Sequence, residues 1–189
     1  RLFNPVFFKA FSNTLIYTLL TLLILIPIPM IIAVILNSKL VKFKTAFRSS
    51  LFIPSLTSVV VAGLIFRLIF AESDMAVANQ ILSFFGVDSI VWTTNRWSAM
   101  FLMVTLASWR WMGVNVLYYL AGLQSIPSEM YESADIDGAS TFQKFKNITM
   151  PFLKPVTSFV TVITIIGGFR VFEESYVFWE AGSPGNIAT

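Results

Sequence analysis

The chain has 189 residues, of which 56% are hydrophobic and only 12% are charged, and its formal net charge is +3. An average soluble domain is about 25% charged, so this composition indicates a membrane protein. Because the sequence contains neither Cys nor His, it lacks thiolate nucleophiles, imidazole bases and the usual ligands of zinc and haem. We therefore expect no metal site, no enzyme activity in this chain and, given the small net charge, no nucleic-acid partner.

Four apolar stretches are long enough to cross a bilayer, which takes roughly 20 helical residues. Pro27 and Pro29 should kink the first of them, because each removes a backbone hydrogen-bond donor. No internal repeat or linker is visible, which favours a single transmembrane domain over residues 1–189. We predict an all-α, polytopic membrane helical bundle with spans at about 14–36, 51–70, 97–120 and 152–171.

The distribution of Lys and Arg between the loops predicts the orientation of the spans. On one side lie Lys39, Lys42, Lys44, Arg48, Lys144, Lys146 and Lys154. On the other side lie Arg1, Lys9 and Arg96. This asymmetry places residues 37–50 and 121–151 in the cytoplasm. Residues 73–87, on the outer side, have apolar residues at helical spacing, so we expect a helix along the membrane surface there.

The cytoplasmic stretch "PSEMYESADIDGAS" is unusually acidic for this chain. Pro127 suits the first turn of a helix, and either Ser125 or Ser128 offers an N-terminal cap. Gly138 is a natural terminator, because glycine readily adopts a positive φ. We therefore predict a short helix over residues 128–138.

A second helix should begin directly after this turn. Ser140 and Gln143 have the spacing of a capping box, and the helix that follows should run towards Pro151. Two interpretations of the whole element stay open. It is either a surface helix that docks into a partner's groove or a solvated loop whose acids keep it soluble.

The same stretch carries a longer pattern of fixed spacing. Glu132-Ser133-Ala134 is followed by Gly138 after three residues, by Ile148 after nine more and then by Met150-Pro151. This spacing resembles the signature loop of the inner-membrane permease subunits of binding-protein-dependent ABC importers, which reads Glu-Ala-Ala, three residues, Gly, nine residues, Ile, one residue, Leu-Pro. Ser133 and Met150 depart from it, by residues of similar size.

In that family the loop is a coupling helix that inserts into a cleft of the ATP-binding subunit. The resemblance implies that Glu132 contacts the ATPase and that Ala134 and Gly138 permit close packing. The ATPase-coupling residues that we expect are Glu132, Ser133, Ala134, Asp137, Gly138, Ile148 and Pro151.

Other stretches resemble the carbohydrate-uptake branch of the family, the branch of the permeases for maltose and for sn-glycerol phosphate. They are "NTLIYTLLTLLI", "AVILNSKLVKFKTAFRSSLFIPSLTS" and "FRVFEESYVFWEAGSPGNIAT". The resemblance implies that one family span is missing before Arg1 and another after Thr189. It also implies a bacterial inner-membrane location, surrounding membrane lipid, two ATP-binding subunits, a second permease subunit, an extracytoplasmic solute-binding protein and a sugar or oligosaccharide as solute.

The sequence contains no Gly-x-x-x-x-Gly-Lys-Ser/Thr phosphate loop. We therefore expect ATP and Mg²⁺ to bind the partner ATPase, with no cofactor in this chain.

Polar and aromatic residues inside the spans are candidates for the solute path, because charges in a bilayer normally face protein or water. Aromatic faces and hydrogen-bonding groups suit sugars. Alternatively, Arg170 pairs with Glu173 as a structural ion pair, Gly167 and Gly168 serve helix packing, and Arg67 snorkels to the outer surface. The candidates are Trp109, Arg110, Trp111, Asn115, Gly167, Arg170 and Phe172.

Three other functions stay open at this point. One is an ABC permease for a polyol phosphate or a peptide, since the coupling loop carries no information about the solute. An ion-coupled carrier is a second, although the acids lie in loops or near span ends rather than at the midplane. An intramembrane hydrolase is a third.

Overall fold

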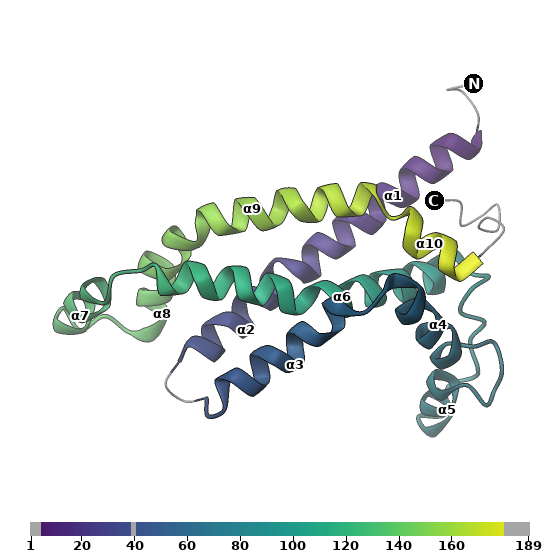
Figure 1. Cartoon of the computed structure of the whole chain (residues 1–189), viewed down its shortest axis with the longest axis horizontal. Coiled ribbons are helices and arrows are strands. Elements are labelled where there is room, and N and C mark those ends of the chain that lie inside the picture. The colour runs from purple at the N-terminus through teal and green to yellow at the C-terminus, as the bar shows by residue number, and fades with distance from the viewer. Residues whose placement is uncertain (1–4, 39–40, 180–189) are drawn as a thin grey trace.

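A computed structural model describes residues 5–38 and 41–179, and every regular element among them is a helix (Figure 1). The predicted all-α architecture is confirmed. Arg1, Lys39 and the segment 180–189 lie outside the described residues. The elements are α1 (Pro5–Leu25), α2 (Pro27–Asn37), α3 (Lys44–Leu56), α4 (Val59–Ile69), α5 (Val77–Phe84), α6 (Arg96–Gln124), α7 (Ser128–Ile136), α8 (Thr141–Lys144), a π-helical turn (Phe145–Thr149), α9 (Met150–Phe169) and α10 (Phe172–Trp179).

Three helical stretches are long and apolar enough to cross a membrane, namely Pro5–Asn37, Arg96–Gln124 and Thr141–Phe169. They correspond to the first, third and fourth predicted spans, each starting earlier than the hydropathy indicated. The fourth prediction ran to residue 171, whereas the helix ends at Phe169 and α10 is separate.

The second predicted span, 51–70, is not one straight helix. It consists of α3 and α4, which are bent by 96° relative to each other. Thr57 and Ser58 between them have ψ angles of 132° and 140°, which are extended rather than helical. The break follows Pro54, which sits inside α3 and cannot donate a helical hydrogen bond. The pair counts as the fourth span only if it crosses the membrane as a bent unit.

The predicted interruption of the first span is confirmed at Ile26, the single residue between α1 and α2. Pro29 has no N–H to offer the carbonyl of Leu25, four residues earlier. Asn115 of α6 supplies the missing donor, with its Nδ2 3.2 Å from the Leu25 oxygen. A neighbouring span thus satisfies the carbonyl that the proline frees, as is required inside a bilayer.

The long helix α6 is the centre of the bundle, because it contributes to both hydrophobic cores and packs against α1, α2, α3 and α9. The contact with α3 depends on Gly113. A Cβ atom at this position would lie 1.8 Å from the carbonyl oxygen of Leu51. Only a glycine lets the two backbones approach this closely.

The two ends of the bundle differ in content (Figure 1). The α2–α3 connection, α7 and α8 lie at one end, and α5 and α10 lie at the other. The loops predicted to be cytoplasmic, 37–50 and 121–151, therefore share one end. The predicted surface helix exists as α5, shorter than expected. Its buried Asn79 accepts a 2.9 Å hydrogen bond from the indole N–H of Trp92, which fixes α5 to the following loop.

Candidate functional site

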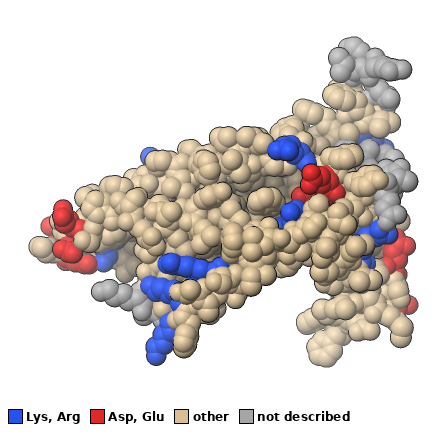
Figure 2. Space-filling view, in the orientation of Figure 1, with Lys and Arg blue, Asp and Glu red and all other residues tan. Residues whose placement is uncertain are grey.

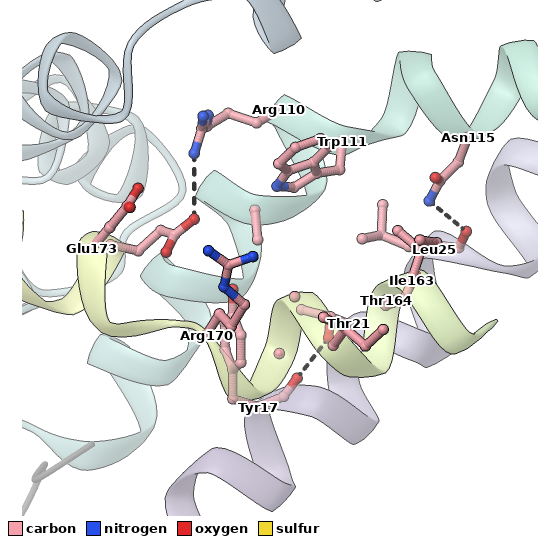
Figure 3. Close-up of a pocket in the computed structure, with 15 residues that line it drawn as sticks. Tyr17, Thr21, Leu25, Arg110, Trp111, Asn115, Ile163, Thr164, Arg170 and Glu173 are labelled. Atoms are coloured by element: carbon pink, nitrogen blue, oxygen red, sulfur yellow. Dashed lines mark hydrogen bonds and ion pairs between the residues drawn. The ribbon is translucent and has the colours of Figure 1, made fainter. Parts of the chain in front are cut away.

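A cavity of about 380 Å³ lies among α1, α6, α9 and α10, towards the end of the bundle opposite α7 (Figure 3). Its wall combines two guanidinium groups and two carboxylates with hydroxyl, amide and aromatic side chains. The residues that line it are Tyr17, Thr21, Leu25, Ala107, Arg110, Trp111, Asn115, Ile163, Thr164, Ile166, Gly167, Gly168, Arg170, Glu173 and Glu174.

An ion pair crosses the cavity from α6 to α10. Arg110 Nη1 lies 3.3 Å from Glu174 Oε1, and each side chain is only 12% exposed. Burial raises the pKa of Glu174, while a backbone hydrogen bond and Arg110 act against this rise. The sequence instead suggested a pair between Arg170 and Glu173, three residues apart. The observed partners are separated by 64 residues, so no local spacing reveals them.

Arg110 has further donor capacity at the cavity. Its Nε atom is buried and has no hydrogen-bond partner among the described residues. Its guanidinium carbon lies 5.5 Å from the ring centroid of Trp111, within the range of a cation–π contact. The arginine is thus held by a carboxylate and a ring, and its Nε–H is buried beside the cavity without a partner among the described residues.

Of the predicted path residues, five line the cavity: Arg110, Trp111, Asn115, Gly167 and Arg170. The other two, Trp109 and Phe172, are outside its lining. The Trp109 ring packs 5.7 Å from that of Phe66 on α4. Phe172 stacks on Tyr176 at 5.8 Å.

The two adjacent glycines of α9 play different parts. A Cβ atom on Gly168 would lie 2.3 Å from Thr18 Oγ1, so this glycine lets α1 and α9 pack closely. A Cβ atom on Gly167 would meet nothing within 4 Å. Packing therefore explains Gly168, whereas Gly167 faces open space in the cavity wall.

Sequence reasoning missed Tyr17, Thr21, Thr164 and Glu174 as cavity residues. Thr21 is tolerated in an apolar helix because its Oγ1 donates to the carbonyl of Tyr17 at 3.0 Å, which satisfies the hydroxyl within its own helix. Neither a charge nor a break in hydropathy marks Tyr17, Thr21 or Thr164, and Glu174 lies just beyond the predicted span. Arg67, which was expected to snorkel to the outer surface, donates to the carbonyl of Val177 in α10 at 3.5 Å.

At the opposite end, α7 confirms the predicted short helix. Gly138 follows it with φ +71°, as the terminator should. The capping box is also present: Gln143 N donates to Ser140 Oγ, and Ser140 N donates to Gln143 Oε1. The proposed N-terminal cap is wrong, because α7 has no side-chain cap. Ser125 instead donates to the Gly122 carbonyl at the end of α6.

Two side-chain contacts attach α7 to the helix that follows it. The Tyr131 hydroxyl lies 2.9 Å from Thr149 Oγ1, and Lys144 Nζ lies 2.5 Å from Asp135 Oδ1. Thr141–Phe169 runs as one helical stretch through the π turn and past Pro151. These contacts connect α7 to the helical stretch that contains the fourth span.

The predicted coupling residues fall into two groups. Ile148 is buried in the hydrophobic core that contains Tyr119 and Leu120, and Ala134 is partly buried against that core. Both residues therefore anchor the loop to the bundle. The remaining five are exposed to solvent: Glu132, Ser133, Asp137, Gly138 and Pro151. Figure 2 shows the acidic side chains gathered at this tip of the molecule.

Comparison with known proteins connects both regions to one family. Residues 3–172 match the family described as the binding-protein-dependent transport system inner membrane component. The chain belongs to this family. The match includes the whole of α7 and the cavity residues as far as Arg170, whereas Glu173 and Glu174 lie just beyond it.

Relatives with assigned names are similar over nearly the whole chain. The arabinooligosaccharides transport system permease protein AraP of Halalkalibacterium halodurans is 65% identical over 187 residues, covering 99% of this chain and 59% of that protein. The lactose transport system permease protein LacF of Rhizobium radiobacter is 36% identical, covering 98% of this chain and 63% of that protein. The chain thus spans about three fifths of the length of these relatives.

Solved structures agree with the fold. A bacterial ABC transporter involved in the import of the acidic polysaccharide alginate matches with a TM-score of 0.86 at 27% identity, over 98% of this chain and 65% of that one. The same kind of transporter in complex with an alginate pentasaccharide-bound periplasmic protein matches with a TM-score of 0.85 at 26% identity, over 98% and 64% of the two chains.

Proposed function

We propose that this chain is the transmembrane permease part of an ATP-driven, binding-protein-dependent importer of a sugar or oligosaccharide. The cavity serves as part of the solute path, and α7 serves as the contact for an ATPase subunit. The observation that carries the proposal is that α6 and α9 each run from the cavity to the α7 loop. A force on the loop therefore reaches the cavity through two continuous helices.

The chemistry of the cavity suits a carbohydrate. Trp111 offers an aromatic face, while Thr21 and Thr164 offer hydrogen bonds to hydroxyl groups. Because the positive and negative side chains of the cavity are equal in number, no excess charge binds a solute tightly. Weak, distributed binding of this kind lets a solute leave as readily as it enters.

The charge balance of the cavity favours a neutral solute over a polyol phosphate. Its two arginines face two glutamates, and Arg110 is already paired with Glu174. A phosphate entering the cavity would meet these carboxylates, and like charges at close range are costly. The relatives named for arabinooligosaccharides and lactose are consistent with a neutral sugar.

The surface of α7 suits docking more than simple solvation. Ile136 is 87% exposed and Phe142, just beyond the turn, is 71% exposed. Apolar side chains exposed together on a small acidic tip favour a protein partner. We assign Glu132 to contact the ATPase, and Ala134 and Ile148 to hold the helix against the bundle.

The proposed cycle requires partners that this chain does not contain. ATP and Mg²⁺ bind two cytoplasmic ATPase subunits, a second permease completes the path, and an extracytoplasmic binding protein delivers the solute. Closure of the ATPases pushes α7 and changes the side from which the cavity opens, as a two-state element biased by ATP. The proposed location is the bacterial inner membrane, with residues 37–50 and 121–151 in the cytoplasm.

The test compares two glutamates of the same exposed helix in the complete, reconstituted importer. Glu132→Ala should weaken ATPase binding about tenfold, the effect of losing roughly 1.4 kcal/mol at an interface centre. Solute-stimulated ATP hydrolysis and uptake should fall with it. Glu129→Ala, in the first turn of α7, is the matched control and should leave both rates near normal. Equal behaviour of the two variants would contradict the docking role.

A second candidate, an ion-coupled carrier, makes the opposite prediction about energy. In such a carrier the paired charges of the cavity would bind the coupling ion, and uptake would continue without ATP. Uptake by proteoliposomes that contain the full importer, with and without ATP inside and with an imposed ion gradient, separates the two. We expect uptake only with ATP.

A further inference from the structure

A second hollow lies on the other side of α9, between its cytoplasmic half and the break of the first span. This groove has a volume of about 670 Å³, and none of its residues lines the solute cavity. Ser158 and Val162 of the groove each lie five residues before a cavity residue, Ile163 and Gly167. Five residues rotate a helix by roughly 140°, so the groove residue and the cavity residue of each pair point in different directions. The residues that line the groove are Ile26, Met30, Lys146, Met150, Pro151, Lys154, Thr157, Ser158, Thr161 and Val162.

Lys146 stands at the cytoplasmic end of this groove and Lys154 about halfway along it, and the part beyond Lys154 combines apolar side chains with three hydroxyl groups. None of the described residues that line the groove is acidic. Lys146 lies within the π-helical turn, which changes the rotation of the helix before Lys154, and both side chains reach the same groove. The groove therefore attracts a negative charge at its mouth and offers an apolar channel beyond it.

The depth of the groove matches one leaflet of a bilayer. Lys154 and Val162 are eight residues apart, which is about 12 Å along a helix. The hydrocarbon core of one leaflet is about 15 Å thick. If the lysines lie at the cytoplasmic headgroup level, the channel of Met30, Thr161 and Val162 lies at the level of the acyl chains. The stretch Thr141–Phe169, which contains α9, is also the least buried of the three long spans within this chain.

We propose that the groove binds an anionic phospholipid of the inner leaflet. The lipid phosphate contacts Lys146 and Lys154, hydroxyl groups of the groove support the glycerol region, and an acyl chain lies against Met30 and Val162. Basic pockets between spans on the cytoplasmic side suit such headgroups. The inference uses the membrane orientation of the chain and does not depend on which solute is carried.

The test measures lipid binding to the purified importer complex in neutral detergent. Phosphatidylglycerol is titrated in, with phosphatidylcholine as the neutral comparison, and bound lipid is counted by native mass spectrometry. Two lysines near the headgroups contribute about 1 kcal/mol each. The double variant Lys146→Gln with Lys154→Gln should therefore bind phosphatidylglycerol roughly 20- to 30-fold more weakly. The control, Lys42→Gln with Lys44→Gln, removes the same charge outside the groove and should bind as the unchanged complex does.

A second measurement identifies the occupant directly. A photoreactive residue in place of Ser158, which lies in the groove and is exposed, should capture phospholipid in membranes. Equal loss of lipid in both double variants would overturn the proposal, because the effect would then be general surface charge. Capture of the second permease subunit at Ser158 would overturn it as well, since the groove would then be a subunit interface. Neither outcome would affect the docking role of α7, which is measured by ATP hydrolysis.

Discussion

The cavity and the α7 loop contain one ion pair each, and the two pairs are built differently. Arg110 and Glu174 are each 12% exposed and join α6 to α10 across the cavity. Lys144 and Asp135 are 22% and 61% exposed and join α8 to α7 at the tip. A buried pair is costly to break, because the remaining charge stays desolvated, whereas water replaces either partner of an exposed pair. In the cavity, each charge thus depends on its partner to remain buried, whereas the loop is held mainly by its apolar anchors.

The largest expected effect comes from breaking the buried pair. Glu174→Ala leaves Arg110 buried without its carboxylate, so the free energy of unfolding should fall by about 3 to 5 kcal/mol. Thermal unfolding of the purified complex measures the loss. The double variant Glu174→Ala with Arg110→Met removes the stranded charge and should recover much of this stability. A double variant as unstable as Glu174→Ala alone would show that the pair does not account for the effect.

A smaller loss of stability should distinguish the tightly packed Gly168 from Gly167, which faces open space in the cavity wall. Gly168→Ala places a methyl group 2.3 Å from Thr18 Oγ1, and such overpacking costs about 1 to 3 kcal/mol of unfolding free energy. Gly167→Ala is the matched control, because its new methyl group meets no atom within 4 Å. The melting temperatures of the two variants should therefore differ. If Gly167→Ala destabilises the fold equally, the assigned close approach of α1 and α9 is wrong.

The smallest effect is expected at the tip. Asp135→Ala removes the exposed ion pair with Lys144, and such pairs contribute about 0 to 1 kcal/mol. Stability should hardly change, and added salt should reduce even that difference. A loss comparable to that of Glu174→Ala would mean that the tip, like the cavity, depends on its charges.

The sequence predicted local features well. The long apolar runs located three spans, because length and hydropathy are properties of contiguous residues. Gly138 and the Ser140–Gln143 box were predicted for the same reason, since caps depend on residues three or four positions apart. The sequence did not predict the break at Thr57, because two extended residues do not interrupt an apolar run.

The cavity was predicted only in part, because it is assembled from segments far apart in the chain. Arg110 stood out as a charge inside a span, but its partner Glu174 lies 64 residues away. Tyr17 and Thr21 come from another helix and are ordinary members of an apolar span by composition. The role of Asn115 at the Leu25 carbonyl also needed the structure, because it depends on which helix faces the proline break.

The central claim is that a partner acting on α7 changes access to the cavity through α6 and α9. It can be measured with a thiol introduced into this stretch, because none of the 189 residues is Cys. In Gly167→Cys the sulfur replaces empty space in the cavity wall. The measurement is its rate of labelling by a membrane-impermeant maleimide added from outside to the reconstituted importer. We predict faster labelling when a non-hydrolysable ATP analogue is bound, and no such change when Glu132→Ala is added. A labelling rate that is the same with and without the nucleotide would contradict the claim.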